Sequence, residues 1–398
     1  MRVLVINCGS SSLKYQLITT ENESVITKGI IERIGDGPEY TYFTKKGEKI
    51  KKPVNVNNHT EAVQAVIDNL LSRDNGFISS LNEIEAIGHR VVHGGEEFYS
   101  SVFITDRVLE SIEKYAELAP LHNPANIQGI RSCREVLPGK RQVAVFDTAF
   151  HQTMPESSYI YALPYEYYEK YRIRRYGFHG TSHSYVSKKA AEFMGIDKDK
   201  FNCIVCHLGN GSSITAVKNG KSFDTSMGYT PLEGLPMGTR SGSIDPAIIF
   251  TLLQRENLTM DKINDILNRK SGLIGISGVS NDLREINEAA SKGNKRAELA
   301  KEILVKSIRK YIGSYLIELG KVDAIIFTAG IGENEFAIRE KCTEGLEEWG
   351  IKLDRENNNK TRAKLAFIST PDSRIKILVV PTNEELMIAM ETESVLGN

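Results

Sequence analysis

The chain has 398 residues, 40% of them hydrophobic and 25% charged, with a formal net charge of −1 at pH 7. This composition is typical of a globular protein with about two domains, and the charge supplies no long-range attraction for nucleic acid or an anionic membrane. The sequence contains no apolar run long enough to span a bilayer and no export signal, and its 5 cysteines suit a reducing compartment better than a disulfide framework. We therefore expect a cytoplasmic protein that binds neither nucleic acid nor membrane.

The N-terminal segment 3–18 predicts two strands joined by a turn of small residues. Its first half is apolar and rich in β-branched residues, and after Asn7 and the Gly/Ser turn 9–12 it alternates apolar with polar side chains. Such a turn exposes N–H groups and hydroxyls to which a phosphate can bind. Lys14 adds a positive charge, and Asn7 offers an oxygen to a metal ion or its water. A plain Gly/Ser hairpin with a surface lysine explains this segment equally well.

The remaining elements of the first half are predicted as hairpin-like strands over 19–60, helices over 61–71 and 106–118, and strands over 84–92 and 142–147. Arg90 lies in the run GHRVVHGGE at the end of one strand, and Asp147 ends another. We place a domain boundary near residue 150, after this last strand.

The second half repeats the opening pattern. Segment 202–217 again has an apolar strand, a Gly/Ser turn and an alternating strand, which suggests a duplicated fold in which each half supplies a phosphate loop to one cleft. Other elements predicted here are a Gly-flanked turn at His179 that feeds a helix, a helix capped by Asp245 with Pro246 as its first residue, a capping box of Asp282 and Glu285, an amphipathic helix over 294–319, a strand from 323 into a Gly-rich turn at Gly330 and Gly332, and a last helix capped by Thr382 and Glu385.

Apolar strands end on polar or Gly-rich turns at Asn7, Arg90, Asp147, His207 and Gly330. Ligands of α/β sheets collect at the carboxyl ends of the strands. Gly-flanked loops supply two further groups, Arg240 and His179. Because phosphoryl transfer needs phosphate cradles, Mg²⁺ ligands and fixed cations, these turns together predict a nucleotide-phosphate site.

Two sequence patterns resemble metal or haem sites, but we do not interpret either of them as such a site. The run from Cys203 to His207 matches the c-type haem pattern by letters, but residues three apart in a strand point to opposite faces, so we interpret its cysteines as core residues. His179 and His183 lie four residues apart, and no cysteine or carboxylate nearby completes a site. For Glu384, the residues alone favour a simple charge at a helix N-terminus.

The chain resembles the acetate kinases, in the acetate and sugar kinase/Hsp70/actin superfamily, from end to end. The matching blocks are NCGSSSLKYQL, GHRVVHGGE, LAPLHNP, FDTAFHQTMP, YGFHGTSH, CHLGNGSS, MGTRSGSIDP, SNDLRE, FTAGIGEN and PTNEEL. The family transfers a phosphoryl group reversibly from ATP to acetate, giving acetyl phosphate and ADP. The resemblance implies a duplicated ribonuclease H-like (actin-like ATPase) α/β fold with two domains around an active-site cleft. Residues 1–150, with the C-terminal helix 384–398 packed back on them, would form the acyl side, and residues 151–383 the nucleotide-binding domain.

The resemblance also implies a role for each matching residue. Mg²⁺, with Mn²⁺ as an alternative, would be held by Asn7 and Glu384, which reverses the interpretation of Glu384. The catalytic residues would be Arg90, which binds the acetate carboxylate, Asp147, which acts as acid/base or orients it, and His179 and Arg240, which stabilise the transferred group. The protein would be a homodimer.

The binding residues follow in the same way. ATP or ADP would be bound by Ser10, Ser12, Lys14, His207, Leu208, Gly209, Asn210, Gly211, Asp282, Leu283, Arg284, Gly330, Ile331, Gly332, Glu333 and Asn334. The methyl group of acetate would lie among Val92, Leu121, Phe178 and Pro231, with His122 in a supporting role. The sequence departs from the family at Cys8, where many relatives have alanine, and at Leu283, where an aromatic residue is common.

Two alternatives stay open. A propionate or butyrate kinase would share nearly all of these residues, and Val92 favours the smaller acid because a smaller side chain would admit a longer tail. An actin- or Hsp70-like ATP switch belongs to a different class, and it would need neither Arg90 and Asp147 nor the apolar pocket.

Overall fold

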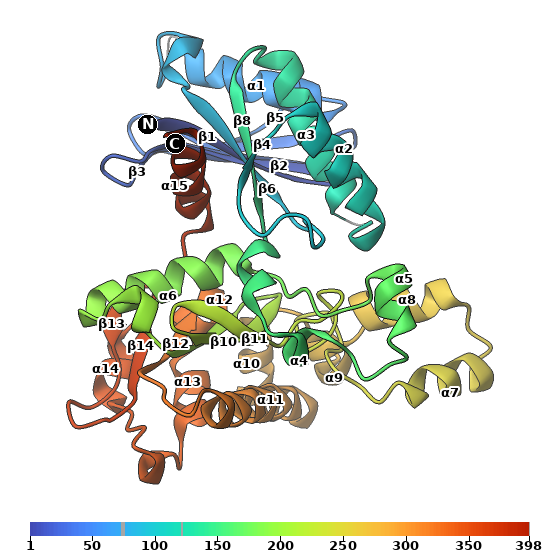
Figure 1. Ribbon diagram of the computed structural model, residues 1–398, viewed down its shortest axis with the longest axis vertical. Coiled ribbons are helices and arrows are strands. Elements are labelled where there is room, and N and C mark those ends of the chain that lie inside the picture. The colour runs from blue at the N-terminus through green and yellow to red at the C-terminus, as the bar shows by residue number, and fades with distance from the viewer. Residues whose placement is uncertain (73–75, 121, 398) are drawn as a thin grey trace. The chain divides into compact units, whose positions relative to one another are not determined.

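The computed structural model describes residues 1–72, 76–120 and 122–397. The chain forms two compact units (Figure 1). The first consists of Met1–Phe150 and the C-terminal segment from Asn383 onward, and the second consists of His151–Thr382.

The first unit contains an 8-stranded sheet with the order β5-β4-β3-β2-β1-β6-β8-β7. Its strands are β1 (Arg2–Gly9), β2 (Ser12–Thr19), β3 (Ser24–Glu32), β4 (Glu39–Phe43), β5 (Lys49–Pro53), β6 (Ala86–Val91), β7 (Val102–Phe103) and β8 (Arg141–Phe146). Its helices are α1 (His59–Leu71), α2 (Asp106–Lys114), α3 (Asn123–Val136) and α15 (Glu384–Gly397). Strands β1, β6 and β8 are parallel neighbours, whereas on the other side of β1 the sheet continues with β2 antiparallel to β1 and β3 antiparallel to β2.

Helices cover both faces of this first sheet. Leu4, Ile6 and Cys8 alternate along β1 and pack with residues of α1 and α3 in one buried cluster. The C-terminal helix α15 packs on β1, β6 and β8. A Cβ atom at Gly88 would lie 2.5 Å from the Thr392 hydroxyl and 2.7 Å from a methyl of Ile388, so the glycine in β6 permits this close approach.

The second unit contains a 6-stranded sheet with the order β11-β10-β9-β12-β14-β13. Its strands are β9 (Cys203–Leu208), β10 (Ser212–Lys218), β11 (Lys221–Thr225), β12 (Ala324–Thr328), β13 (Ala366–Phe367) and β14 (Lys376–Val379). Its helices are α4 (Glu156–Tyr159), α5 (Glu166–Tyr171), α6 (Gly180–Met194), α7 (Ala247–Arg255), α8 (Met260–Arg269), α9 (Gly272–Ser277), α10 (Leu283–Ser291), α11 (Lys295–Leu319), α12 (Ala329–Asn334), α13 (Phe336–Thr343) and α14 (Arg355–Lys360).

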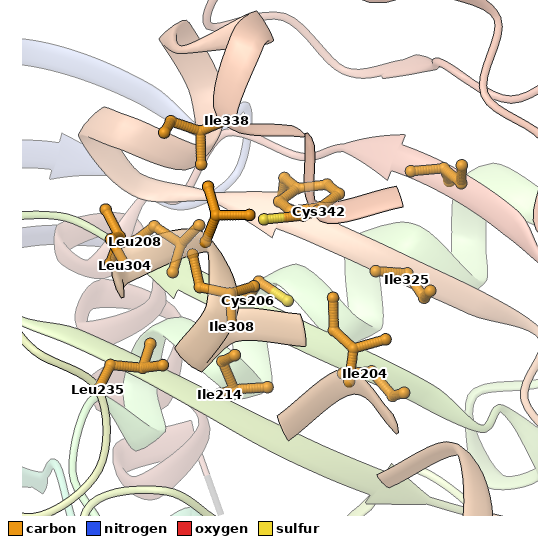
Figure 2. Close-up of a cluster of buried hydrophobic side chains, with 14 of the residues drawn as sticks. Ile204, Cys206, Leu208, Ile214, Leu235, Leu304, Ile308, Ile325, Ile338 and Cys342 are labelled. Carbon is orange, nitrogen blue, oxygen red and sulfur yellow. The ribbon is translucent and has the colours of Figure 1, made fainter. Parts of the chain in front are cut away.

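The core of the second unit lies between its sheet and α11. Alternate residues of β9, including Ile204 and Cys206, pack against Leu304 and Ile308, which lie four residues apart on α11 (Figure 2). Helix α6 covers the other face of the sheet (Figure 1). Cys206 is therefore a core residue, as the sequence predicted, and all of the chain's cysteines are buried free thiols.

The two sheets share a five-strand arrangement. Three antiparallel strands are followed by two that are parallel to the third, in the orders β3-β2-β1-β6-β8 and β11-β10-β9-β12-β14. The segments 3–18 and 202–217 occupy equivalent places as β1–β2 and β9–β10. The duplication that these segments predicted is confirmed.

Several local predictions differ from the structure. Thr382 does not cap α15: Asn383 accepts the hydrogen bond from the N–H of Leu386 at 3.1 Å, while the Thr382 hydroxyl pairs with Ser182. The turn predicted at Gly330 is the short helix α12, which begins directly after β12. Helix α7 begins one residue later than predicted, although Asp245 still accepts a hydrogen bond from its first N–H group.

The predicted helix over 106–118 ends at Lys114 and continues as a 3₁₀ turn. Within the described part of the chain, none of the helices combines the length and the apolar character that crossing a bilayer would require.

Candidate active site

In the first unit, the parallel strands bring three predicted residues to the same edge of the sheet. Ile6 on β1 is paired with His89 on β6, so Asn7 and Arg90 follow at the same level. Asp147 comes directly after β8, and its N–H donates to the carbonyl of Val91 at 3.0 Å. Strand pairing therefore positions Asn7, Arg90 and Asp147 at the carboxyl ends of adjacent strands, where α/β sheets bind ligands.

Arg90 and Asp147 form an ion pair with two hydrogen bonds. The Arg90 Nε donates to Oδ1 at 3.1 Å, and Nη2 donates to Oδ2 at 2.6 Å. The carboxylate raises the pKa of Arg90 against the opposing effect of burial. This pairing fixes the plane of the guanidinium, and no hydrogen bond from its Nη1 occurs among the described residues.

Glu384 begins α15 and lies near this ion pair. Burial raises the pKa of its carboxyl group, and Asp147 and Glu385 act in the same direction, whereas Arg90 and Lys14 oppose them. Lys14 itself is paired with the carboxylate of Glu385. The first unit thus concentrates both signs of charge at one edge of its sheet.

Two asparagines that the sequence analysis did not assign to the site hold its backbone in place. Asn126 accepts from the N–H of Val92 at 3.0 Å and donates to the carbonyl of Cys8 at 2.9 Å, which ties the ends of β6 and β1 together. Asn123 exchanges hydrogen bonds with the backbone N–H and C=O of His93. The two asparagines are three residues apart at the start of a helix, which places both on one face. This spacing is the sequence signal that could have identified them.

The other predicted residues of the first unit are placed as follows. Val92 is buried, His122 is half-buried and precedes α3, Ser10 is exposed in the turn between β1 and β2, and Ser12 is half-buried at the start of β2. Leu121 lies outside the described residues.

In the second unit, His179 and Arg240 converge above the glycine loop between β9 and β10. A Cβ atom built on Gly211 would lie 3.5 Å from Nε2 of His179 and 3.7 Å from Nη1 of Arg240. The two nitrogens therefore lie around the same space next to a backbone that has no side chain. That is the arrangement of donors expected around a transferred phosphoryl group.

His179 has an unusual backbone conformation. Its φ of 58° lies in the left-handed region, which is uncommon for residues other than glycine. It directly precedes α6, and its carbonyl accepts a hydrogen bond from the N–H of His183 at 2.9 Å. Residues held in this region cluster at functional sites, so the conformation supports a role for the imidazole.

Arg240 lies in a loop that is attached to the glycine loop. The N–H of Gly238 donates to the carbonyl of Asn210 at 3.0 Å, and Arg240 Nη1 donates to the carbonyl of Pro231 at 3.4 Å. Burial lowers the pKa of Arg240, and among the described residues no carboxylate forms an ion pair with it. A partly buried guanidinium without a counter-ion is suited to bind an anion.

Comparison with known proteins identifies the family. The model of the acetokinase family matches residues 2–390. The chain belongs to the acetokinase family. It is 57% identical to the acetate kinase of Caldanaerobacter subterraneus subsp. tengcongensis over 398 residues, covering 100% of this chain and 99% of the relative. It is also 57% identical to the acetate kinase of Thermoanaerobacterium thermosaccharolyticum over 397 residues, with the same coverage.

Solved structures agree with this assignment. The crystal structure of the Porphyromonas gingivalis acetate kinase is 48% identical and covers 99% of both chains with a TM-score of 0.96. A propionate kinase from Francisella tularensis is 45% identical, with a TM-score of 0.92 and coverage of 99% of both chains. The predicted family and its actin-like ATPase fold are confirmed. The chain is therefore a phosphotransferase, which sets aside the non-enzymatic ATP switch.

The residues predicted to bind the nucleotide differ in accessibility. The imidazole of His207 stacks on that of His179 with 4.2 Å between ring centroids, and its Nδ1 is 2.8 Å from the hydroxyl of Ser182. Leu208 and Leu283 are buried and belong to the core of this acetokinase-family unit. The loop of Gly209, Asn210 and Gly211 is half-buried or exposed.

The other residues predicted to bind the nucleotide lie around the starts of α10 and α12. Arg284 is exposed and hydrogen-bonds to Asp282, whose carboxylate also caps α10. Burial raises the pKa of Glu333, which accepts a hydrogen bond from the N–H of Thr382 at 3.1 Å. The residues from Gly330 to Asn334, which include Ile331 and Gly332, form α12.

The residues predicted for the methyl pocket are divided between the units. Phe178 is buried in the second unit, and its carbonyl is 3.0 Å from Nε2 of His151. Pro231 is half-buried beside Arg240. His151 was not part of the predicted site, and no sequence pattern indicated its contact with Phe178.

The residues expected to hold Mg²⁺ fit that ion. Asn7 and Glu384 offer an amide oxygen and a carboxylate, which are the hard donors that Mg²⁺ and Mn²⁺ prefer. The described residues contain no cluster of three or more His, Cys, Asp or Glu side chains that could hold a metal ion alone. Mg²⁺ in nucleotide enzymes characteristically uses one or two carboxylates and takes its other ligands from phosphates and water. The donor set therefore suits a metal that arrives with a nucleotide.

Proposed function

We propose that this member of the acetokinase family transfers the γ-phosphoryl group of ATP to acetate by in-line displacement, giving acetyl phosphate and ADP, in a reversible reaction. The observation that carries the proposal is the convergence of His179 Nε2 and Arg240 Nη1 on the space above Gly211. Donors held in a fixed position stabilise the charge that develops on the phosphoryl oxygens without a cost of reorganisation. Such arginines contribute about 10³–10⁵-fold to phosphoryl transfer.

In the first unit, Arg90 would bind the carboxylate of acetate. Its Nε and Nη2 are occupied by Asp147, which would leave Nη1 to donate to the substrate. A carboxyl group titrates near ~4, so acetate needs no base to become a nucleophile at neutral pH. Asp147 would therefore orient Arg90, and catalysis would depend mainly on positioning and charge neutralisation.

Asn7 and Glu384 would hold Mg²⁺, for which Mn²⁺ is a chemically similar substitute. The ion would neutralise phosphate charge, and its presence would favour the ionised form of Glu384, whose pKa is raised by burial. Ser10, Ser12 and Lys14 would line the phosphate path, and the residues of α12 with Asp282 and Arg284 would bind the rest of ATP or ADP.

The experiment that tests the function is incubation of the purified chain with ATP, Mg²⁺, acetate and hydroxylamine, followed by detection of acetyl hydroxamate. We expect hydroxamate that requires acetate, and its formation should be lost in Arg240→Ala. Propionate and butyrate serve as further acceptors, and one methylene changes the rate by about 10–200-fold. ATP hydrolysis without any acyl hydroxamate would contradict the proposal.

The same proposal includes a cytoplasmic homodimer. Its support is α7, a mostly apolar helix of which no residue is buried, with Ile248 44% and Phe250 64% exposed. A second copy of the chain would cover such a surface. Light scattering should give the mass of a dimer, and Phe250→Glu should shift the protein toward the monomer.

A further inference from the structure

A single serine hydroxyl lies between two histidines of the second unit. The Oγ of Ser213 on β10 is 2.9 Å from Nδ1 of His179 and 2.7 Å from Nε2 of His183 on α6. Ser213 and His183 are both completely buried. Among the described residues, the two rings are the only hydrogen-bond partners of this hydroxyl. An unpaired buried O–H is costly, so the hydroxyl donates its one proton to one ring and accepts from the other.

The surroundings of His183 decide which of the two groups, His183 or Ser213, donates the hydrogen bond between them. Its Nδ1 is buried and has no hydrogen-bond partner among the described residues. Burial, with the neighbouring rings of His151 and His207, places the pKa of His183 well below its ordinary value, so the ring is neutral and carries one N–H. A buried N–H without a partner is rarer in proteins than a buried acceptor without one. The proton of His183 is therefore on Nε2, where it donates to Ser213.

The orientation of the serine and of His179 follows. Because Ser213 accepts from His183, its own O–H is directed to Nδ1 of His179. With Nδ1 as an acceptor, the neutral ring of His179 carries its proton on Nε2. That atom faces the space above Gly211, which Nη1 of Arg240 also approaches.

We propose that Ser213 and His183 are positioning residues that fix the tautomer of His179, so that its Nε2–H is directed to the transferred phosphoryl group. The inference rests on the proposed function only for the identity of that group. Neither residue touches the substrate; both act through His179. With the opposite tautomer, His179 would present a lone pair to phosphate oxygens and repel them.

The first test is the tautomer itself. The unmodified protein is labelled with ¹⁵N-histidine, and the side-chain resonances of its 8 histidines are recorded at about pH 8, above the ordinary histidine pKa of ~6.5. The signals of His179 and His183 are assigned with His179→Gln and His183→Gln. We expect the Nε2–H form for both rings. An Nδ1–H form of His179 would overturn the proposal, and this measurement requires no active variant.

The second test uses kinetics. In Ser213→Ala and His183→Met we expect kcat to fall about tenfold, the effect of one hydrogen bond, while the KM values for acetate and ATP stay within about twofold. The double variant should lose no more than either single one, because the three groups act as a unit. His183→Gln is the matched control: it has a similar volume to Met and keeps an amide N–H near the position of Nε2, so it should retain most of kcat.

These variants distinguish the positioning of His179 by Ser213 and His183 from a merely structural role of the two residues. A merely structural role would make Gln and Met equally harmful, would make the losses of the double variant additive, and would shift thermal unfolding in step with activity. Any of these results would contradict the proposal. If the unmodified chain formed no acetyl phosphate, the proposed function would fail. The tautomer measurement would still decide whether Ser213 and His183 fix the tautomer of His179.

Discussion

Arg90 and Asp147 differ in their access to solvent although they form one ion pair: the side chain of Arg90 is 25% exposed, and that of Asp147 is 2% exposed. The carboxylate therefore serves as an internal support, and the guanidinium is the member that can reach a substrate. The folded protein can hold the buried charge of Asp147 at low cost only while Arg90 compensates it, because a buried charge without a partner is costly.

The first prediction concerns this dependence. In Arg90→Ala we expect a higher KM for acetate together with a lower kcat, and a loss of about 3 kcal/mol in the free energy of unfolding, because Asp147 is left buried without a counter-ion. Urea denaturation and initial rates at varied acetate concentration measure the two effects. The double variant Arg90→Ala with Asp147→Asn should recover most of the stability and none of the activity. Equal stability of the single and double variants would contradict this account.

A second prediction concerns Glu384 and pH. Burial raises the pKa of its carboxyl group above the ordinary value of 4.5, so the folded protein holds the proton more tightly than the unfolded chain does. Stability contributed by this group is therefore lost as the pH rises from about the ordinary value through the raised one. We expect Glu384→Gln to have a larger free energy of unfolding than the parent at pH 7, and the difference should shrink as the pH is lowered toward 4.5.

The control for Glu384 is the next residue of the same helix. Glu385→Gln removes the ion pair with Lys14 and should lower stability slightly, by at most about 1 kcal/mol, since Lys14 is largely exposed. Glu384→Gln should also lose activity at every Mg²⁺ concentration, because an amide is a weaker ligand than a carboxylate. A Glu384→Gln protein that is less stable than the parent at pH 7 would contradict the prediction.

The individual site residues could be predicted from the sequence, but their contacts could not. Arg90 and Asp147 were each recognised as residues at the end of an apolar strand. Their pairing depends on the register of β6 against β8, which are separated in the chain by α2 and α3. Nothing in a local pattern specifies a register between strands so far apart.

The same limit explains the residues that were missed. Ser213 contacts two histidines only because α6 packs against β9, next to β10, and a serine within an alternating strand has no local feature that reveals this. The segment from Gly330 was predicted as a turn because glycine is a poor helix former. Packing of α12 on β9 and β12 overrides that preference.

A third prediction is that Arg240 contributes to the rate of the reaction and little to the free energy of unfolding. Arg240 has no carboxylate partner among the described residues, and burial lowers its pKa. In Arg240→Ala we therefore expect kcat to fall by about 10³-fold, while the free energy of unfolding without ligands changes by less than about 1 kcal/mol. Arg240→Lys keeps the charge but loses the planar geometry, so it should recover only part of kcat. Rates close to those of the parent in Arg240→Ala would refute the role of this residue.

The last prediction concerns the length of the acyl substrate. Val92 is buried directly after β6, two residues beyond Arg90, and its N–H donates to Asn126, which opposes a shift of the backbone. If Val92 lines the methyl pocket, as the resemblance implies, a longer acid bound to Arg90 would need the volume that this side chain occupies. Val92→Ala should therefore raise kcat/KM for propionate relative to acetate by about tenfold, within the range for one methylene, and Val92→Ile should lower the same ratio. Initial rates with both acids give the ratio for each variant. Because the two substitutions change the volume in opposite directions, a shift of the same sign in both would show that Val92 does not limit the length of the substrate.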